Sequence, residues 1–466
     1  MKAASAYTTY RASGLPWVPQ LPEGWQVLRN GRLFGHRVEM GFPDLPILEV
    51  SLRTGVRVRD MENLKRKQVM SQKEKYKRAA KGDIAYNMMR MWQGAVGPAP
   101  VDGLVSPAYV VVKPYDEANS SYYSHLFRTA AYMQEVNKFS RGIVADRNRL
   151  YWESFKQMPS LAPPRPEQDQ IVAYLRAQDA HIARFIQAKR DLIKLLTEQK
   201  LRIIDHAVTR GLDANFTLKP SGTEWLGEVP EHWEVQRLKN VANVVLGKML
   251  TTEAKAGDGD FKSYMRSTNV QWIKPDVRDV KEMWVAKAEM AQLRVRKGDL
   301  LVSEGGEVGR ACMWNDELPE CYIQNSVHRV AAKPMMLPEF LFHQFFAYGK
   351  RGRFNAIVNR VSIAHLTREK LVTVPFTVPP IEEQKAICRW ISDECQPLDD
   401  AITRTEDEIK LIREYRDRLI ADVVTGQVDV RSWQPGPDDV VDDVALAALG
   451  DVQEDVTEEE DGDGKD

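Results

Sequence analysis

The chain has 466 residues, of which 43% are hydrophobic and 28% are charged, a composition typical of globular proteins. Its length allows about two to four domains, and no apolar run approaches the ~20 residues of a membrane helix, so a membrane protein is not expected. The N-terminus lacks the apolar core of a signal peptide, and the four cysteines form no C-x-x-C pair. We therefore expect a cytoplasmic protein with reduced, packed thiols.

The net charge of −1 hides a strong asymmetry along the chain. Between Arg431 and Asp466 there are 13 acidic and 2 basic residues, so the other 430 residues carry a net charge of +10. Residues 1–160 alone hold 24 basic and 14 acidic side chains. Such a basic excess suits contact with the phosphate backbone of nucleic acid, although a solvated lysine-rich surface gives the same count.

Two regions of the chain, residues 1–160 and 214–377, are predicted to be globular. The β-rich runs 109–112 and 299–302 predict strands, and the stretch 122–137 has the pattern of a helix. Turn signals separate these segments. We expect the fold class α/β, in the sense of mixed α+β structure. The sequence does not define the topology.

Residues 161–213 are predicted to form a first spacer helix. Apolar residues recur at alternating steps of four and three, at Ile171, Leu175, Ile182, Phe185, Leu192, Leu196 and Ile203. No glycine or proline interrupts about 43 residues, so a continuous helix would be about 64 Å long. Gly211 then provides a typical helix C-terminus.

Residues 378–430 repeat this pattern as a second spacer helix. Its apolar positions are Ile387, Ile391, Leu398, Ile402, Ile409, Ile412, Leu419 and Val423. Pro397 fits the first turn of a renewed helix better than a helix interior, so we expect a break or kink near Gln396. A seam of this length needs a partner helix, and the simplest arrangement is an antiparallel coiled-coil pair that holds the two globular regions apart. The alternative is that each helix folds onto its own globular region.

The strongest feature of the sequence is an internal repeat with an offset of 216 positions. The segment Pro163–Gln168, which reads P-P-R-P-E-Q, returns as Pro379–Gln384, which reads P-P-I-E-E-Q. The same offset carries Lys81–Ile84 onto Lys297–Leu300. The residues between these anchors differ almost completely. A repeated frame around divergent interiors predicts an internal pseudo-twofold repeat that performs one mechanical task on two different targets.

Motifs that would carry chemistry are missing from the sequence. There is no G-x-x-x-x-G-K-[ST] loop, no H-E-x-x-H pair, and no Cys/His cluster with zinc spacing. The glycine-rich stretch Gly305–Gly309 follows a predicted strand and is interpreted as a turn. We expect a chain without catalytic residues and without a metal site.

Residues 15–430 together resemble the DNA specificity subunit of type I restriction–modification enzymes. The resemblance depends on the segment Lys81–Ala95 with Gly103–Tyr109, on Gly298–Gly306 with Cys321–Arg329, and on the two Pro-Pro-x-x-Glu-Gln frames. It implies two target-recognition domains (1–160 and 214–377), each reading one half of a split site on double-stranded DNA. It also implies that the two helices set the gap and dock two modification subunits.

The modification subunits would bind S-adenosylmethionine and methylate adenine N6, and restriction subunits would add cleavage that uses ATP and Mg²⁺. No cofactor is expected on this chain itself. The alternative is a two-domain coiled-coil interaction protein that does not bind DNA. Residues 431–466, which are rich in acid and poor in aromatic residues, are predicted to be a disordered tail.

Candidate DNA contacts are chosen by side-chain chemistry, because Arg reads guanine, Asn and Gln read adenine, and Lys, Arg and hydroxyl groups contact phosphates. The candidates are Arg57, Arg59, Lys65, Arg66, Lys67, Asn87, Arg90, Gln93, Arg266, Ser267, Thr268, Asn269, Lys350, Arg351 and Arg353. Gln324, Asn325 and His328 are interpreted as scaffold groups, and Trp92 suits a core or a DNA contact equally.

The resemblance assigns a further set of residues to the spacer helices and to partner docking. They are Glu167, Gln168, Ile171, Leu175, Ile182, Leu196, Ile203, Glu383, Gln384, Ile387, Ile391, Leu398, Ile409, Ile412 and Leu419.

Overall fold

The computed structural model describes residues 6–52, 55–59, 73–141, 148–254, 257–305, 307–356 and 366–439, with positions 441, 446 and 449. The chain divides into two compact units, which are Met1–Asp191 with Glu406–Asp466 (unit 1) and Leu192–Thr405 (unit 2). The division cuts through both long helices, α5 (Arg165–Arg210) and α10 (Ile381–Val424). Each unit therefore contains a globular part and a portion of each helix, which differs from the predicted boundaries at the ends of the helices.

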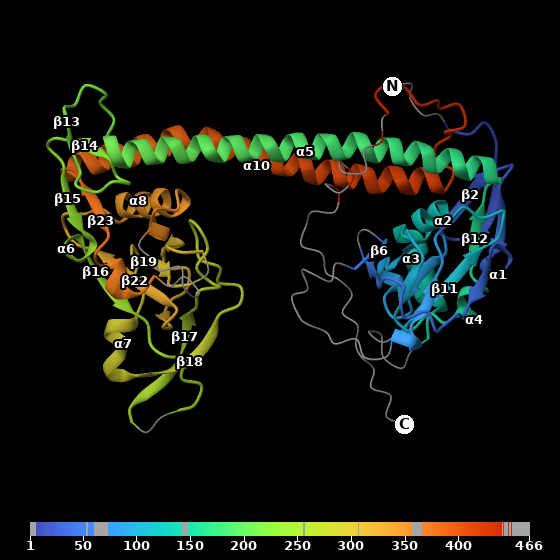
Figure 1. Cartoon of the computed structure of the whole chain (residues 1–466), viewed down its shortest axis with the longest axis horizontal. Helices are drawn as coiled ribbons and strands as arrows, with labels where there is room; N and C mark the ends of the chain where they lie inside the picture. Colours follow the sequence, from blue (N-terminus) through green and yellow to red (C-terminus); the bar gives the residue numbers. More distant parts are fainter. Residues whose placement is uncertain are drawn as a thin grey trace. The chain divides into compact units, whose positions relative to one another are not determined.

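The globular part of unit 1 is built from short strands and helices (Figure 1). The elements are β1 (Tyr10–Leu15), β2 (Val18–Pro22), β3 (Gln26–Arg29), α1 (Asn30–Leu33), β4 (Phe34–Arg37), β5 (Leu48–Ser51), β6 (Gly55–Val58), η1 (Lys73–Lys75), β7 (Lys77–Ala79), β8 (Ile84–Asn87), η2 (Met91–Gln93), β9 (Val96–Pro98), β10 (Gly103–Val105), β11 (Tyr109–Pro114), α2 (Ser120–Phe127), α3 (Ala130–Phe139), α4 (Trp152–Phe155) and β12 (Pro159–Ala162). The main sheet has the antiparallel order β4-β11-β8-β9.

Unit 2 follows the same plan. Its elements are β13 (Leu218–Pro220), β14 (Glu228–Pro230), β15 (Glu234–Arg237), α6 (Leu238–Val241), β16 (Ala242–Leu246), β17 (Gly259–Met265), β18 (Lys281–Ala286), α7 (Lys287–Leu293), β19 (Leu300–Ser303), β20 (Ala311–Met313), β21 (Tyr322–Ile323), β22 (Val327–Ala332), α8 (Pro338–Lys350), η4 (Arg353–Ala356), α9 (Arg368–Leu371) and β23 (Pro375–Val378). The main sheet has the antiparallel order β16-β22-β19-β20.

The two sheet orders confirm the internal repeat, since β4, β11, β8 and β9 correspond to β16, β22, β19 and β20 in chain position and in pairing. The pair β3–β12 likewise corresponds to β15–β23. The turns before β8 and β19 match in detail. Gly82 and Gly298 have φ values of 88° and 85°, which favour glycine. The following aspartates, Asp83 and Asp299, accept hydrogen bonds from the backbone amides of Ala80 and Arg296.

The units differ in their second, smaller cores. In unit 1 the pairs β5–β6 and β7–β10 enclose a core that includes Leu48, Val50 and Val105. In unit 2 the sheet β18-β17-β21, whose β17–β21 pairing is parallel, encloses one that includes Met283 and Trp314. The divergent stretches of sequence therefore build different structures on a shared frame.

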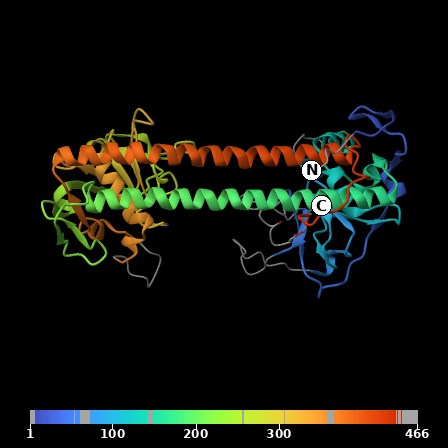
Figure 2. The same ribbon diagram turned by 90° about the horizontal axis from the view of Figure 1, so that it is seen from above.

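Helices α5 and α10 run antiparallel and side by side within each unit (Figures 1 and 2). In unit 1 the Arg416 guanidinium donates to both carboxylate oxygens of Asp179 at 2.6 and 2.9 Å. In unit 2 the Lys200 ammonium contacts both oxygens of Asp399 at 2.5 and 2.7 Å. The predicted fold class is confirmed: two mixed α/β units are joined by two long helices.

The helices are buried mainly against the globular parts rather than along one continuous seam. Ile171, Leu175 and Ile182 of α5 are buried in unit 1, and Ile387 and Ile391 of α10 are buried in unit 2. Val423 of α10 is buried in unit 1. The remaining predicted seam positions are half-buried, and they are Leu196, Ile203, Leu398, Ile402, Ile409, Ile412 and Leu419. The prediction of a continuous seam was wrong at Phe185 and Leu192, whose side chains are exposed. Both packing modes considered from the sequence are therefore present.

The break predicted near Gln396 does not occur, because Pro397 lies inside the continuous helix α10. Proline lacks the amide hydrogen that would bond to the carbonyl four residues earlier, and its ring crowds that carbonyl. Packing on both sides of the site, by Cys395 and by the Lys200–Asp399 contact, holds the helix together.

We expect Pro397→Ala to raise the free energy of unfolding of the full chain by about 1–3 kcal/mol, because the helix gains its missing hydrogen bond. Pro397 is exposed, so the change removes little packing. Urea unfolding measures the effect, and Ser392→Ala, at an exposed position on the same helix, is the control. An unchanged or lower stability would contradict the prediction.

The chain stays packed beyond the end of α10, which corrects the predicted start of the tail at residue 431. Gln170 Nε2 donates to the Trp433 carbonyl at 2.6 Å, and the Trp433 ring lies edge-on to Tyr174 at 5.5 Å. Asp439 contacts His181 Nε2 at 2.7 Å. Residues 431–439 thus follow α5, and most of the predicted tail beyond them lies outside the described residues.

Among the described helices none is long and apolar enough to cross a bilayer. The four cysteines are free thiols, and burial raises the pKa of Cys395 to about 11 and of Cys321 to about 12. Within the described ranges no three His, Cys, Asp or Glu side chains are grouped as metal ligands.

Candidate nucleic-acid interface

The Pro-Pro-x-x-Glu-Gln frame of unit 1 joins α5 to its own globular part. Glu167 accepts hydrogen bonds from Trp25 Nε1 at 3.0 Å and from the Tyr7 hydroxyl at 2.6 Å. Gln168 is buried, accepts from the backbone amide of Asn119 at 2.8 Å, and donates to two backbone carbonyls at 2.8 and 3.0 Å. The Gln168 amide can donate two hydrogen bonds and accept two, and three of these four are made inside the unit.

The second frame makes the equivalent contacts in unit 2. Glu383 accepts from Trp233 Nε1 at 3.0 Å and lies 2.8 Å from His232 Nε2. Gln384 is also buried, accepts from the Leu337 amide at 2.8 Å, and donates to two carbonyls at 2.8 and 2.9 Å. The assignment of both Glu-Gln pairs to partner docking is therefore corrected, since these side chains fasten each helix to its own unit.

In unit 1 the candidate segment 87–93 contains both internal and accessible side chains. Asn87 is 2% exposed, and its Oδ1 accepts from the Met89 amide at 2.9 Å. The Trp92 indole donates to the Met89 carbonyl at 2.9 Å. Arg90 is half-exposed and Gln93 is exposed. Arg90 and Gln93 remain candidates for DNA contact, whereas Asn87 is removed because its amide shapes the turn after β8.

The basic run of unit 1 is only partly described. Arg57 Nε lies 2.6 Å from Glu49 Oε1, and Arg59 Nε lies 3.8 Å from the other oxygen of the same carboxylate. One acidic side chain therefore partly neutralises both arginines. The candidates Lys65, Arg66 and Lys67 lie outside the described residues.

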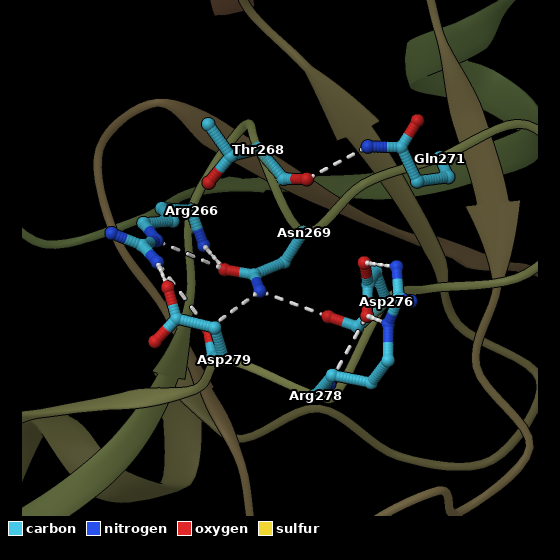
Figure 3. Close-up of polar contacts among 7 residues, drawn as sticks. All are labelled: Arg266, Thr268, Asn269, Gln271, Asp276, Arg278 and Asp279. Atoms are coloured by element: carbon cyan, nitrogen blue, oxygen red, sulfur yellow. Dashed lines mark hydrogen bonds and ion pairs between the residues drawn. The ribbon is translucent and has the colours of Figure 1, made fainter. Parts of the chain in front are cut away.

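In unit 2 the candidate segment 266–269 begins a loop between β17 and β18 (Figure 3). Asn269 is 3% exposed, and its Nδ2 donates to the carbonyls of Asp276 and Asp279 at 2.9 and 3.0 Å. Its Oδ1 accepts from the Arg266 amide at 3.2 Å, and the Arg266 guanidinium is paired with the Asp279 carboxylate. Asn269 is the internal brace of the loop, so its prediction as a base contact is withdrawn.

The exposed side chains of this loop include the predicted Thr268 and two residues that sequence reasoning missed, Gln271 and Arg278. Thr268 and Gln271 are exposed, with the Gln271 amide donating to the Thr268 carbonyl at 2.8 Å (Figure 3). Arg278 is almost fully exposed and binds both oxygens of Asp276, which lowers the pKa of that carboxyl to about 2. The sequence shows that Gln271 and Arg278 have side-chain types that can bind DNA. It does not show that Gln271 is exposed while the amide of Asn269 is buried.

Ser267, the remaining residue of the candidate segment 266–269, makes hydrogen bonds through its backbone. The Ser267 backbone amide donates to Ser326 Oγ at 3.0 Å, and the Ser267 carbonyl accepts from Arg310 at 2.9 Å. A cavity of about 370 Å³, lined by Leu250, Arg266, Lys281 and Gln324 among others, opens beside the loop. The cationic side chains of this surface, Arg266 and Lys281, suit contact with phosphates, and the acidic Glu282 lies among them.

The cluster 350–353 has a structural role instead. Arg353 donates to both oxygens of Asp205 at 2.6 and 3.2 Å, and Arg351 contacts Glu198 at 3.0 Å. Both acids belong to α5, so these arginines fasten the globular part of unit 2 to the helix. Lys350 contacts Glu307 at 3.1 Å. We withdraw Arg351 and Arg353 from the candidates, because their ion pairs hold them against α5 at the junction of the helix and the globular part.

The scaffold interpretation is supported most clearly at His328. Its side chain is fully buried, its Nε2 lies 2.8 Å from the Leu366 carbonyl, and burial lowers its pKa. Gln324 and Asn325 hydrogen-bond to each other, and Gln324 also contacts Ser326.

The fold and these surfaces define a class: a protein with two homologous α/β units on shared helices, each with its own polar loop surface. Residues 230–411 match the family model of the type I restriction modification DNA specificity domain. The chain is 21% identical over 286 residues to the type I restriction enzyme MjaVIII specificity subunit of Methanocaldococcus jannaschii, covering 60% of this chain and 64% of that one. It is 24% identical over 280 residues to a putative type I specificity subunit of Haemophilus influenzae, covering 59% and 66%.

A solved structure from work on complex assembly and conformational transition of the type I R-M system has the same fold. Its TM-score is 0.59 at 15% identity, over 88% of this chain and 99% of that one. Over residues 230–411 the chain is thus similar to the specificity domain of type I restriction–modification systems, and the named relatives by sequence are specificity subunits. The matched stretches span somewhat less than two thirds of the length of the named relatives.

Proposed function

We propose that this chain reads a split site on double-stranded DNA, with each unit reading one half. The observation that carries the proposal is the contrast between the two units: the same main sheet and helix frame hold different second cores and different polar loops. One frame with two surfaces suits a reader of two unlike half-sites. The accessible side chains at these surfaces, Arg90, Gln93, Thr268, Gln271 and Arg278, have the chemistry of base and phosphate contacts.

The second element of the proposal is that α5 and α10 dock modification subunits and set the gap between the half-sites. Large apolar side chains are exposed on the parts of the helices away from the frames. In unit 1 Leu411 is 62% exposed and Tyr415 is 51% exposed, and in unit 2 Leu195 is 67% exposed. Exposed apolar side chains gathered on one element are typical of a protein interface. These residues replace the Glu-Gln pairs as docking candidates.

The chemistry belongs to the partner subunits in this proposal. Two modification subunits bind S-adenosylmethionine and methylate adenine N6, and restriction subunits add ATP- and Mg²⁺-dependent cleavage. The chain itself supplies recognition and spacing, and it acts in the cytoplasm, where the modified DNA lies. Support comes from the names of the relatives, which are specificity subunits of type I restriction enzymes.

Sequencing of methylated adenines in cells that carry this chain with its modification subunits tests the proposal. We expect one two-part motif with a gap of constant length, because two units on one frame read two separated half-sites. Omitting the chain while keeping the modification subunits is the control and should abolish the motif. A continuous motif, or a motif that persists without the chain, would contradict the proposal.

A further inference from the structure

Two arginines of unit 1 lie directly opposite each other across an antiparallel bridge. Arg141 and Arg149 exchange both backbone hydrogen bonds, with N–O distances of 3.0 and 2.9 Å, and form an isolated bridge. Directly opposed residues of this kind project their side chains to the same face, with Cβ atoms about 5 Å apart. Both side chains are exposed. The bridge therefore holds two positive charges side by side.

Neither guanidinium has a counter-charge within the part of the chain that the structure describes. Other arginines of unit 1 contact carboxylates, and these include Arg37 with Asp83, Arg57 with Glu49, Arg78 with Asp102, Arg165 with Asp169 and Arg416 with Asp179. Like charges placed opposite each other across a strand pair destabilise it. An anion that binds both side chains removes this repulsion.

The bridge is attached to the candidate segment of unit 1. The backbone amide of Leu150, directly after the bridge, donates to the Met88 carbonyl at 2.8 Å. Met88 is two residues before Arg90, whose half-exposed side chain also contacts no carboxylate in the described ranges. This backbone hydrogen bond joins the chain next to Arg149 to the segment that carries Arg90, about 60 residues earlier in sequence.

We propose that Arg141 and Arg149, with Arg90 beside them, form a binding site for the DNA phosphate backbone in unit 1. Guanidinium groups bind phosphate through paired N–H donors and remain charged at every working pH. The exposure of the pair suits an extended polyanion that lies across the surface. The phosphates held here orient the duplex so that Gln93 faces a base edge. This proposal rests on the proposed function and names the residues through which unit 1 binds the DNA backbone.

The test is a salt series of duplex DNA binding by the full chain, using a fluorescent duplex of random sequence. Each neutralised phosphate contributes about 0.9 to the slope of log K against log salt. We expect Arg141→Ala with Arg149→Ala to lower the slope by about two and to weaken binding about 10- to 100-fold at 0.1 M salt. Arg32→Ala, at an exposed arginine of α1, is the matched control and should leave the slope unchanged.

Thermal unfolding without DNA gives an independent readout. Because the paired charges repel, Arg149→Ala should leave the unfolding temperature unchanged or raise it, and Arg141→Glu should raise it while weakening DNA binding further. An unchanged salt slope in the double variant, with the wild type binding normally, would overturn the phosphate site and leave the DNA-reading function intact. A wild-type chain that does not bind duplex DNA at any salt would overturn both. A lower unfolding temperature in Arg149→Ala would also contradict the site, since it would show a structural role.

Discussion

On the proposed function, exchange of residues 15–160 for the equivalent segment of a type I specificity subunit is expected to change one half of the methylated motif and leave the other half unchanged. The reason is that unit 1 has its own core, which includes apolar side chains of both helices such as Ile171 and Val424. Trp25 donates to Glu167, and the Tyr122 hydroxyl donates to the Val424 carbonyl at 3.0 Å. A donor segment that carries Trp and Tyr at these two positions, and apolar residues at the positions that pack on the helices, keeps the junction.

The measurement is the methylated-adenine motif in cells that carry the hybrid chain with its modification subunits. The reciprocal exchange of residues 214–377 is the control, and it should change only the other half-site. Both exchanges should leave the gap unchanged, because α5 and α10 remain those of the host chain. A hybrid whose motif changes in both halves would show that the units do not read independently.

Replacement of Gln384 by alanine is expected to lower the free energy of unfolding by about 2–6 kcal/mol. The amide accepts from the Leu337 backbone and donates to the Met335 and Pro379 carbonyls, so its removal leaves one buried and two part-buried hydrogen bonds unmade. Each part-buried hydrogen bond contributes about 0.5–1.5 kcal/mol. Each unpaired buried group costs about 1–3 kcal/mol. Gln168→Ala should act similarly in unit 1, because that amide also makes three hydrogen bonds to the backbone.

Urea unfolding of the full chain measures both variants. Gln396→Ala on α10 and Gln187→Ala on α5 are matched controls, because these exposed amides bond only to carboxylates one helical turn away, Asp400 and Asp191. The controls should change stability by less than about 0.5 kcal/mol. Equal effects of Gln384→Ala and Gln396→Ala would show that the frame glutamines do not hold the helices to the units.

The repeat was the part of the fold that sequence showed best. Two copies of Pro-Pro-x-x-Glu-Gln at one offset predicted two equivalent units, and the sheets β4-β11-β8-β9 and β16-β22-β19-β20 have the same order. The lengths of α5 and α10 also followed from apolar periodicity and from the absence of glycine, because helix formation depends mainly on neighbours in sequence. Pro397 is the exception, since packing overrode a local preference.

Candidate contacts were predicted less well, because side-chain type does not reveal burial. Asn87 and Asn269 have the chemistry that reads adenine, yet each braces the turn in which it lies. Arg351 and Arg353 have the chemistry that binds phosphate, yet their partners are acids on α5 about 150 positions away. In contrast Gln93 and Gln271, with the same amide group as those asparagines, are exposed.

The sequence by itself determined the two long helices and the internal repeat, because these depend on spacing and on residue types within short stretches. Only the tertiary structure decided which polar groups face solvent, which helix segments cover each unit, and which charges are neutralised. Those outcomes depend on contacts between residues that are not neighbours in sequence: Glu167 accepts from Trp25, Arg353 pairs with Asp205, and Arg141 faces Arg149 across a bridge. Whether a charged or amide side chain braces the fold or stays available for DNA depends on the residues that the fold places beside it.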